Sequence, residues 1–310
     1  MTTTSGPVTA PAQHEDARSG RVSRGEWLRR LLPLAVLLIM IIFFGIKASS
    51  FLSPANFTLM TGQAGILLLT ALGATLVVIA GSVDLSVGST ILLTGAVLAI
   101  FINNVSSNLF AAIGITIALG LGVGILNGVV FAYGKVPSFI TTLGTLSLLS
   151  GIALAILDGE SITFTSSSVD NLAIGRLIPY VQNAALVALV IFLAVWFLAR
   201  RTRFGLYVYA LGGNEQVVRL AGVKVRRMKL YIMILSALTA AIAGLLLAGQ
   251  LSSGSPSLGS DSLLDSIAAI VVGGTALSGG IGGVGRAESA GIAGDAGVIL
   301  AVGREHGDVR

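Results

Sequence analysis

Any chemistry in this sequence must come from a few polar side chains set among apolar ones. The most unusual is Asp84, which lies within 81–89, between two apolar runs with almost no connecting loop. One interpretation of this motif, Asp84, Ser86 and Gly88, is that Asp84 caps backbone N–H groups at the start of the second run, with Ser86 and Ser89 close by. The other is a gating, coupling or substrate-binding role, because a carboxylate among apolar residues is costly and is usually functional. The spacing leaves both interpretations open.

Three further polar side chains, Asn127, Thr141 and Thr145, interrupt later apolar runs. A buried amide or hydroxyl either hydrogen-bonds to a neighbouring helix or lines a hydrated pathway, and the sequence does not separate the two. The run that holds Asn127 also carries glycines at every fourth position, which places them on one face of a helix. Such a stripe predicts close packing against another helix. The stripe consists of Gly120, Gly124 and Gly128.

Several kinds of chemistry are excluded by what the sequence lacks. Cysteine is absent, and the two histidines, His14 and His306, lie in polar ends of the chain. Thiolate or histidine catalysis and a metal site are therefore not expected, and no cofactor is predicted. The pair that ends at Lys135 lacks the glycine and the hydroxyl residue of a phosphate-binding loop, since valines stand at 129 and 136. The chain therefore has no ATPase motif and is not predicted to be an enzyme.

The elements that position these residues follow from composition. The chain has 310 residues, of which 54% are hydrophobic and 11% are charged. Soluble domains carry about 25% charged residues, so the membrane is the expected solvent. Eight apolar runs approach the roughly 20 residues that cross a bilayer as a helix. The predicted fold is an all-α polytopic membrane helix bundle with about eight segments: 31–46, 64–80, 85–101, 111–133, 139–157, 184–199, 230–251 and 263–281.

Two places in this bundle are expected to be irregular. The second and third segments are nearly continuous, so 81–89 forms either a tight helical hairpin or a broken, partly re-entrant element. The eighth segment becomes rich in glycine, and 273–285 is expected to be broken or re-entrant as well. Irregular backbone at membrane depth requires cover from protein or a water-filled cavity.

Basic residues predict the orientation of the chain. One cluster precedes the first segment and another fills 200–229, and six segments separate them. An even number places both clusters on the same side, which should be cytoplasmic, with the N-terminus. The isoelectric point near 9.9 thus reflects topology, and nucleic acid is not an expected partner. The predicted parts are a cytoplasmic tail at 1–30, a transmembrane domain at 31–285 and a polar tail at 286–310.

The cytoplasmic loop at 200–229 predicts a short amphipathic helix. Asn214 is placed to cap it, Glu215 lies in its first turn, and Gly222 is placed to end it in a left-handed turn. Such a helix either lies on the lipid surface or docks on a partner protein, and spacing does not decide between these alternatives.

Three stretches together resemble one family, the permease subunits of ribose-type bacterial ABC importers, related to branched-chain amino acid permeases. They are 81–89, 210–225 and 267–280, and the similarity extends from about residue 31 to 285. The resemblance implies a monosaccharide permease in the bacterial inner membrane. It also implies as partners a cytoplasmic ATP-binding subunit, an extracytoplasmic solute-binding protein and a second permease copy, identical or paralogous. In such permeases the cytoplasmic loop docks on the ATPase, which implies a coupling role for Gly212, Asn214, Glu215, Arg219 and Gly222.

Two alternatives remain. An ion-coupled secondary transporter or channel would use Asp84 as its ion or proton site. An inactive permease is the other alternative, because the tail at 286–310 departs from the family pattern. Glu288 and Asp295 interrupt its apolar character, and the abrupt change predicts a frameshifted or truncated end.

Overall fold

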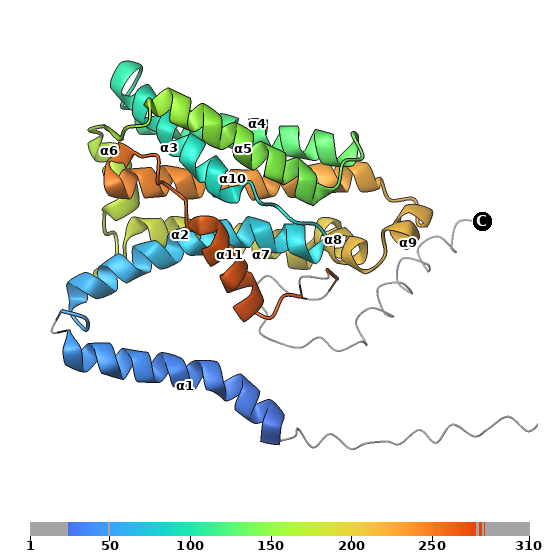
Figure 1. Cartoon of the computed structure of the whole chain (residues 1–310), viewed down its shortest axis with the longest axis horizontal. Coiled ribbons are helices and arrows are strands. Elements are labelled where there is room, and N and C mark those ends of the chain that lie inside the picture. The colour runs from blue at the N-terminus through green and yellow to red at the C-terminus, as the bar shows by residue number, and fades with distance from the viewer. Residues whose placement is uncertain (1–23, 49, 277–278, 281, 283–310) are drawn as a thin grey trace, which may run out of the picture. The chain divides into compact units, whose positions relative to one another are not determined.

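The computed structural model describes residues 24–48, 50–276, 279–280 and 282 (Figure 1). The tail predicted at 286–310 lies outside the described residues. The chain divides into two compact units, one ending at Ser53 and the other beginning at Pro54. The first unit contains α1 (Arg24–Lys47), on which large apolar side chains such as Ile39 and Phe43 are exposed. That exposure is expected of a helix whose solvent is lipid.

The second unit is almost entirely helical. Its helices are α2 (Pro54–Ile79), α3 (Val87–Asn104), α4 (Leu109–Ala132), α5 (Ser138–Leu157), α6 (Ser167–Ile174), α7 (Asn183–Arg201), α8 (Arg203–Gly213), α9 (Glu215–Leu220), α10 (Val225–Leu251) and α11 (Ser262–Val272). The strands β1 (Ile162–Thr163) and β2 (Ser253–Gly254) form one short antiparallel pair.

Among the described residues, six helices are long and apolar enough to cross a membrane: α2, α3, α4, α5, α7 and α10. The predicted all-α polytopic fold is confirmed. The eighth predicted segment is not one continuous helix: α11 has 11 residues and ends at Val272, and the glycine-rich residues after it are irregular, as expected. A helix of that length covers only about half of the hydrocarbon layer. Gly273 and Gly274 follow it, and the φ of Gly274 is +79°.

The core of the bundle is built around α10, which packs against α2, α3, α4 and α6 (Figure 1). The glycine stripe of α4 lies along α10, so the predicted packing role is confirmed. A Cβ atom at Gly120 would lie 3.0 Å from the Cα of Leu238, and one at Gly124 would overlap the backbone of Ile234. Small residues here let the two helix backbones approach closely.

The segment between α2 and α3 is not the tight hairpin that was one of the two predictions. These two helices make few contacts with each other and instead both pack on α10. The connecting residues 80–86 contain a left-handed turn at Gly81, with φ +72°, and are otherwise not helical. The prediction of a broken element is therefore the correct one, and the break places Asp84 against α10 rather than at a hairpin tip.

Glycines from the three stretches singled out in the sequence meet at one point. A Cβ atom at Gly279 would lie 2.7 Å from the Cα of Gly81, and one at Gly212 would overlap Gly280 and the carbonyl of Ile79. The amide of Gly280 donates a hydrogen bond to that carbonyl at 2.9 Å. Because any side chain would separate these backbones, the close approach requires glycine. The α2–α3 connection, α8 and the segment after α11 are thereby joined.

The connecting segments gather at the two ends of the bundle. At one end β1 pairs with β2, and the Asn103 side chain donates to the Thr163 carbonyl at 2.9 Å. At the other end the amide of Val83 donates to the Ser138 hydroxyl at 3.1 Å. Successive helices that cross a membrane must be connected alternately at one end of the bundle and at the other.

Candidate functional site

The first candidate site is a buried polar network centred on Asp84, whose exposed fraction is 6%. Its Oδ1 accepts hydrogen bonds from the Ser86 amide at 2.9 Å and the Ser86 hydroxyl at 2.6 Å. Its Oδ2 accepts one from the Ser236 hydroxyl of α10 at 2.7 Å. Ser86 is the N-cap residue of α3, so Asp84 stabilises the turn that leads into this helix. It does so through one backbone amide and two hydroxyls, rather than as the N-cap itself.

The network continues from Ser86 into α4 and α5. The Asn127 amide donates to the Ser86 hydroxyl at 2.8 Å, and its oxygen accepts from the Thr145 hydroxyl at 2.6 Å. Asn127 is completely buried and Thr145 nearly so. Side-chain hydrogen bonds thus connect four helices in the middle of the bundle: α3, α4, α5 and α10. Buried polar groups of this kind must be satisfied, and once satisfied they fix a single arrangement of the helices.

The other two residues predicted for this region have different surroundings. Thr141 lies one turn before Thr145 and is buried, but its hydroxyl has no hydrogen-bond partner among the described residues. Gly88 is the second residue of α3, where a Cβ atom would come within 2.8 Å of the Gly259 carbonyl. Gly88 therefore admits a neighbouring segment and takes no part in the network. The sequence analysis did not single out Ser236. A serine within an apolar run is the only signal that could have indicated it, and that signal is weak.

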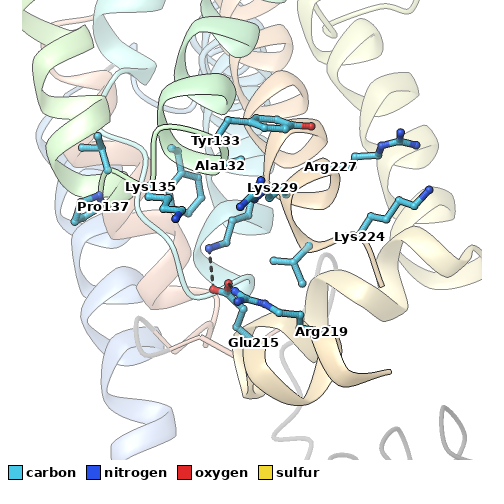
Figure 2. A pocket seen from close by; sticks show the side chains of 13 residues that line it. Ala132, Tyr133, Lys135, Pro137, Glu215, Arg219, Lys224, Arg227 and Lys229 are labelled. Carbon is cyan, nitrogen blue, oxygen red and sulfur yellow. Dashed lines mark hydrogen bonds and ion pairs between the residues drawn. The ribbon is translucent and has the colours of Figure 1, made fainter. Parts of the chain in front are cut away.

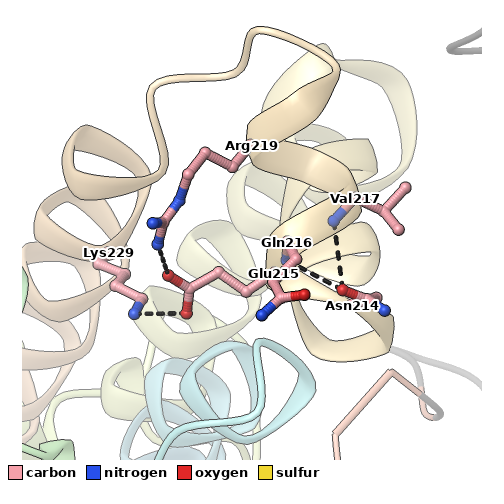
Figure 3. Close-up of polar contacts among 6 residues, drawn as sticks. All are labelled: Asn214, Glu215, Gln216, Val217, Arg219 and Lys229. Carbon is pink, nitrogen blue, oxygen red and sulfur yellow. Dashed lines mark hydrogen bonds and ion pairs between the residues drawn. The ribbon is translucent and has the colours of Figure 1, made fainter.

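The second candidate site is α9 in the loop between α7 and α10. Asn214 caps the helix, accepting from the amides of Gln216 at 2.9 Å and Val217 at 3.2 Å (Figure 3). After the helix, Gly222 has φ +80°, the left-handed conformation that glycine adopts at low cost. An asparagine N-cap contributes on the order of 1 kcal/mol. The helix therefore forms and ends where the sequence predicts.

Glu215 ties this short helix to the start of α10. Its carboxylate accepts from Arg219 at 2.7 Å within α9 and from Lys229 of α10 at 2.7 Å (Figure 3). The hydrogen bond from Lys229 is the main reason why the pKa of Glu215 is lowered, and the charge of Arg219 contributes as well. The Lys229 ammonium also lies 4.7 Å from the centre of the Phe131 ring. Sequence reasoning counted Lys229 only as part of the basic cluster.

The remaining residue of the predicted coupling set, Gly212, lies apart from this ion pair. It belongs to α8 and contacts Ile79 and Gly280 in the glycine cluster. The predicted coupling residues therefore divide between two contacts, one with α10 through Glu215 and one with α2 through Gly212.

One helix connects the two candidate sites. Lys229 and Ser236 are seven residues apart in α10, which is close to two helical turns, so both lie on the same face. Lys229 contacts Glu215 and Ser236 contacts Asp84. The same face of α10 therefore contacts both candidate sites. Within the described part of the chain, no group of histidine, cysteine and carboxylate residues is arranged to hold a metal ion.

The helical membrane bundle agrees with the comparisons with known proteins. Residues 56–306 match the model of the family described as the branched-chain amino acid transport system / permease component. The chain belongs to this family. The match continues well past residue 285, where the sequence analysis expected the similarity to end, and so includes most of the polar tail.

The chain is also similar in sequence to individual curated permeases. It is 36% identical to the ribose import permease protein RbsC of Escherichia coli (strain K12), over 83% of this chain and 80% of that protein. It is 36% identical to the protein of the same name from Bacillus subtilis (strain 168), over 82% and 79%. It is 33% identical to the xylose transport system permease protein XylH of Escherichia coli (strain K12), over 81% and 79%. No solved structure matches the chain significantly.

Family membership and the six apolar helices together describe a multi-pass inner-membrane protein. A permease is a transport component, and the sequence has no phosphate-binding loop of its own. In ABC importers the ATPase activity lies in a separate nucleotide-binding subunit.

Proposed function

We propose that this permease is the membrane-spanning subunit of an ABC importer for a monosaccharide, of the pentose class. The observation that carries the proposal is the similarity over about four-fifths of the chain to permeases named for ribose and for xylose. Both sugars are pentoses of similar size. The family description also names branched-chain amino acids, and these are the nearest alternative cargo.

In this function the loop between α7 and α10 receives the force of the ATPase. Movement of α9 passes to α10 through Glu215 and Lys229, and from Ser236 of α10 to Asp84 at the start of α3. The network then reaches α4 and α5 through Asn127 and Thr145, so four elements respond together. The bundle then has two conformations, one open to each side of the membrane, and the ATPase favours one of them, as alternating access requires.

The partners follow from this role. A cytoplasmic ATP-binding subunit docks on α9, an extracytoplasmic solute-binding protein delivers the sugar, and a second permease copy completes the pathway. The N-terminus and the basic loop lie in the cytoplasm, because positively charged connections stay on that side. The ion-coupled alternative loses support, since both oxygens of Asp84 are already engaged by hydrogen bonds to protein groups.

Transport in proteoliposomes tests the proposal. The permease is reconstituted with its ATP-binding subunit and its solute-binding protein, and uptake of radiolabelled ribose, xylose and leucine is followed with ATP enclosed. We expect uptake of a pentose that requires ATP and the binding protein. A protonophore should leave this uptake unchanged when ATP is held constant.

Two outcomes would contradict the proposal in distinguishable ways. Uptake of leucine in place of either sugar would keep the importer and change the cargo. Sugar uptake driven by an ion gradient without ATP would instead support the ion-coupled mechanism with Asp84 as its site.

A further inference from the structure

A basic groove of about 870 Å³ lies at one end of the bundle, between the α4–α5 turn, α9 and the start of α10 (Figure 2). It is distinct from the buried network around Asp84. Its charged lining consists of one carboxylate, Glu215, and six cations: Lys135, Arg219, Lys224, Arg226, Arg227 and Lys229.

The cations of the groove are poorly neutralised by the protein. Glu215 is shared by Arg219 and Lys229. Among the described residues, the other four cations have no ion pair with a carboxylate, and Lys135 and Arg227 are exposed. With six cations and one carboxylate the groove carries a net positive charge, which attracts anionic groups.

Helix electrostatics makes the arrangement more unusual. Lys224, Arg226 and Arg227 surround the N-terminus of α10, where the helix dipole favours negative charge and disfavours positive charge. Pro137, also in the lining, is the N-cap residue of α5, so a second helix N-terminus opens into the groove. The rule that basic residues stay in the cytoplasm explains their number but does not require them to converge in a groove.

An apolar surface leads into the same groove. Ile125 and Val129 of α4 and its C-cap residue, Tyr133, follow each other at intervals of four residues and thus lie on one face. All three are exposed, by 47%, 43% and 46%, and Tyr133 lines the groove. A ligand that fits both features has an anionic group beside an apolar chain, with the tyrosine at the level where the two meet.

We propose that this groove binds the headgroup of an anionic phospholipid. Lys135 of the α4–α5 turn and Arg227 of α10 supply positive charge that attracts the headgroup, and an acyl chain lies along Ile125 and Val129 of α4. The bound lipid offsets the charge at the start of α10, the helix that also carries Lys229 and Ser236. Anionic lipid is therefore a structural partner of the element that connects α9 with the buried network.

Lipid titration of the purified full chain tests this proposal. Dioleoyl phosphatidylglycerol and dioleoyl phosphatidylcholine are added to the protein in detergent, and bound lipid is counted by native mass spectrometry. We expect the anionic lipid to bind more tightly. In the double variant Lys135→Gln and Arg227→Gln, the preference should fall by about 30-fold, since each basic residue near an anionic lipid contributes about fivefold.

Matched variants separate a groove from general surface charge. The double variant Arg200→Gln and Arg201→Gln removes the same charge from exposed positions at the end of α7, outside the groove. It should change the preference by less than about threefold, because these residues do not line the groove. The charge-retaining pair Lys135→Arg and Arg227→Lys should keep the wild-type preference. Elution volume and melting temperature report whether each variant is folded.

Three outcomes would overturn the proposal. Equal losses in the groove variant and the α7 variant would show that only overall charge matters. Displacement of the lipid by excess inorganic phosphate would assign the groove to a free anion. Unchanged lipid binding in the groove variant, together with lost co-purification of the ATP-binding subunit, would assign it to an acidic protein surface instead.

Discussion

At the residue scale, the hydrogen bonds of Asp84 predict how substitutions will behave. In Asp84→Asn the amide oxygen can keep the contacts with Ser86, and the amide nitrogen can donate to Ser236, whose hydroxyl also accepts. We expect this variant to fold and to transport with ATP. Asp84→Leu leaves three donors without a partner in a dry setting and should cost on the order of 3 kcal/mol or more. Yield of folded protein and ATP-dependent sugar uptake measure both effects.

The matched control for Asp84 is Ser236→Ala, which removes one donor and keeps the carboxylate. It should weaken the link to α10 while leaving the turn at Ser86 intact. A well-folded Asp84→Asn variant that cannot transport would show that the titratable charge itself is needed, and would favour the ion-coupled mechanism.

Glu215 predicts a dependence on pH. Its folded-state pKa is lowered below the ordinary 4.5, mainly by the hydrogen bond from Lys229. The ion pair therefore contributes stability above the unfolded pKa, and that contribution is lost as pH falls through the lower folded value. Because the carboxylate is partly exposed, we expect well under 1 kcal/mol. Melting curves of the wild type and Glu215→Gln should differ at pH 7 and converge at acidic pH, and a constant difference would contradict this cause.

At the scale of elements, the contact between α4 and α10 can be tested with two glycines of one helix. Gly124→Ala places a Cβ atom against the backbone of Ile234, whereas a Cβ atom at Gly122 meets nothing within 4 Å. We expect Gly124→Ala to destabilise the bundle by about 1–3 kcal/mol. Gly122→Ala should be neutral or slightly stabilising, because alanine favours helix. Thermal unfolding in detergent compares them, and equal effects would mean that the stripe does not pack as described.

The end of α9 allows a test of coupling. Gly222→Val places a β-branched residue at φ +80°, which costs on the order of 1 kcal/mol or more. We expect normal membrane insertion but ATP hydrolysis that no longer drives transport. Gly213→Ala is the control in the same loop, since a Cβ atom there meets nothing within 4 Å. Substrate-stimulated ATPase activity that is unchanged in Gly222→Val would count against docking through α9.

At the scale of the whole molecule, the connections predict a topology that labelling can measure. Single cysteines at Ser106 and Ser167 should react with an impermeant maleimide in intact cells, and one at Val217 should react only after the membrane is opened. The chain has no native cysteine, so the wild-type protein should not be labelled and serves as the negative control. The hydrogen bond from Ser166 to the carbonyl of Ser107 places the first two sites at one end of the bundle. Labelling of Val217 from outside would reverse the orientation.

The sequence alone determined the membrane class, the positions of six long helices and the cap and turn of α9. These depend on local properties, such as runs of apolar residues, an asparagine before a helix and a glycine after it. The break after α11 was also expected from local properties, because hydropathy continues past Val272 through glycine-rich residues that do not favour helix.

Only the tertiary structure decided which polar residues act together. Asp84, Asn127 and Thr145 are far from one another in the sequence. No local sequence pattern indicates that α10 places Ser236 beside Asp84. The meeting of Gly81, Gly212 and Gly279 is likewise a property of packing between distant segments. Periodicity specifies which face of a helix is apolar or small, but not which helix covers that face. That choice depends on the packing of the whole bundle, in which a central α10 separates α2 from α3.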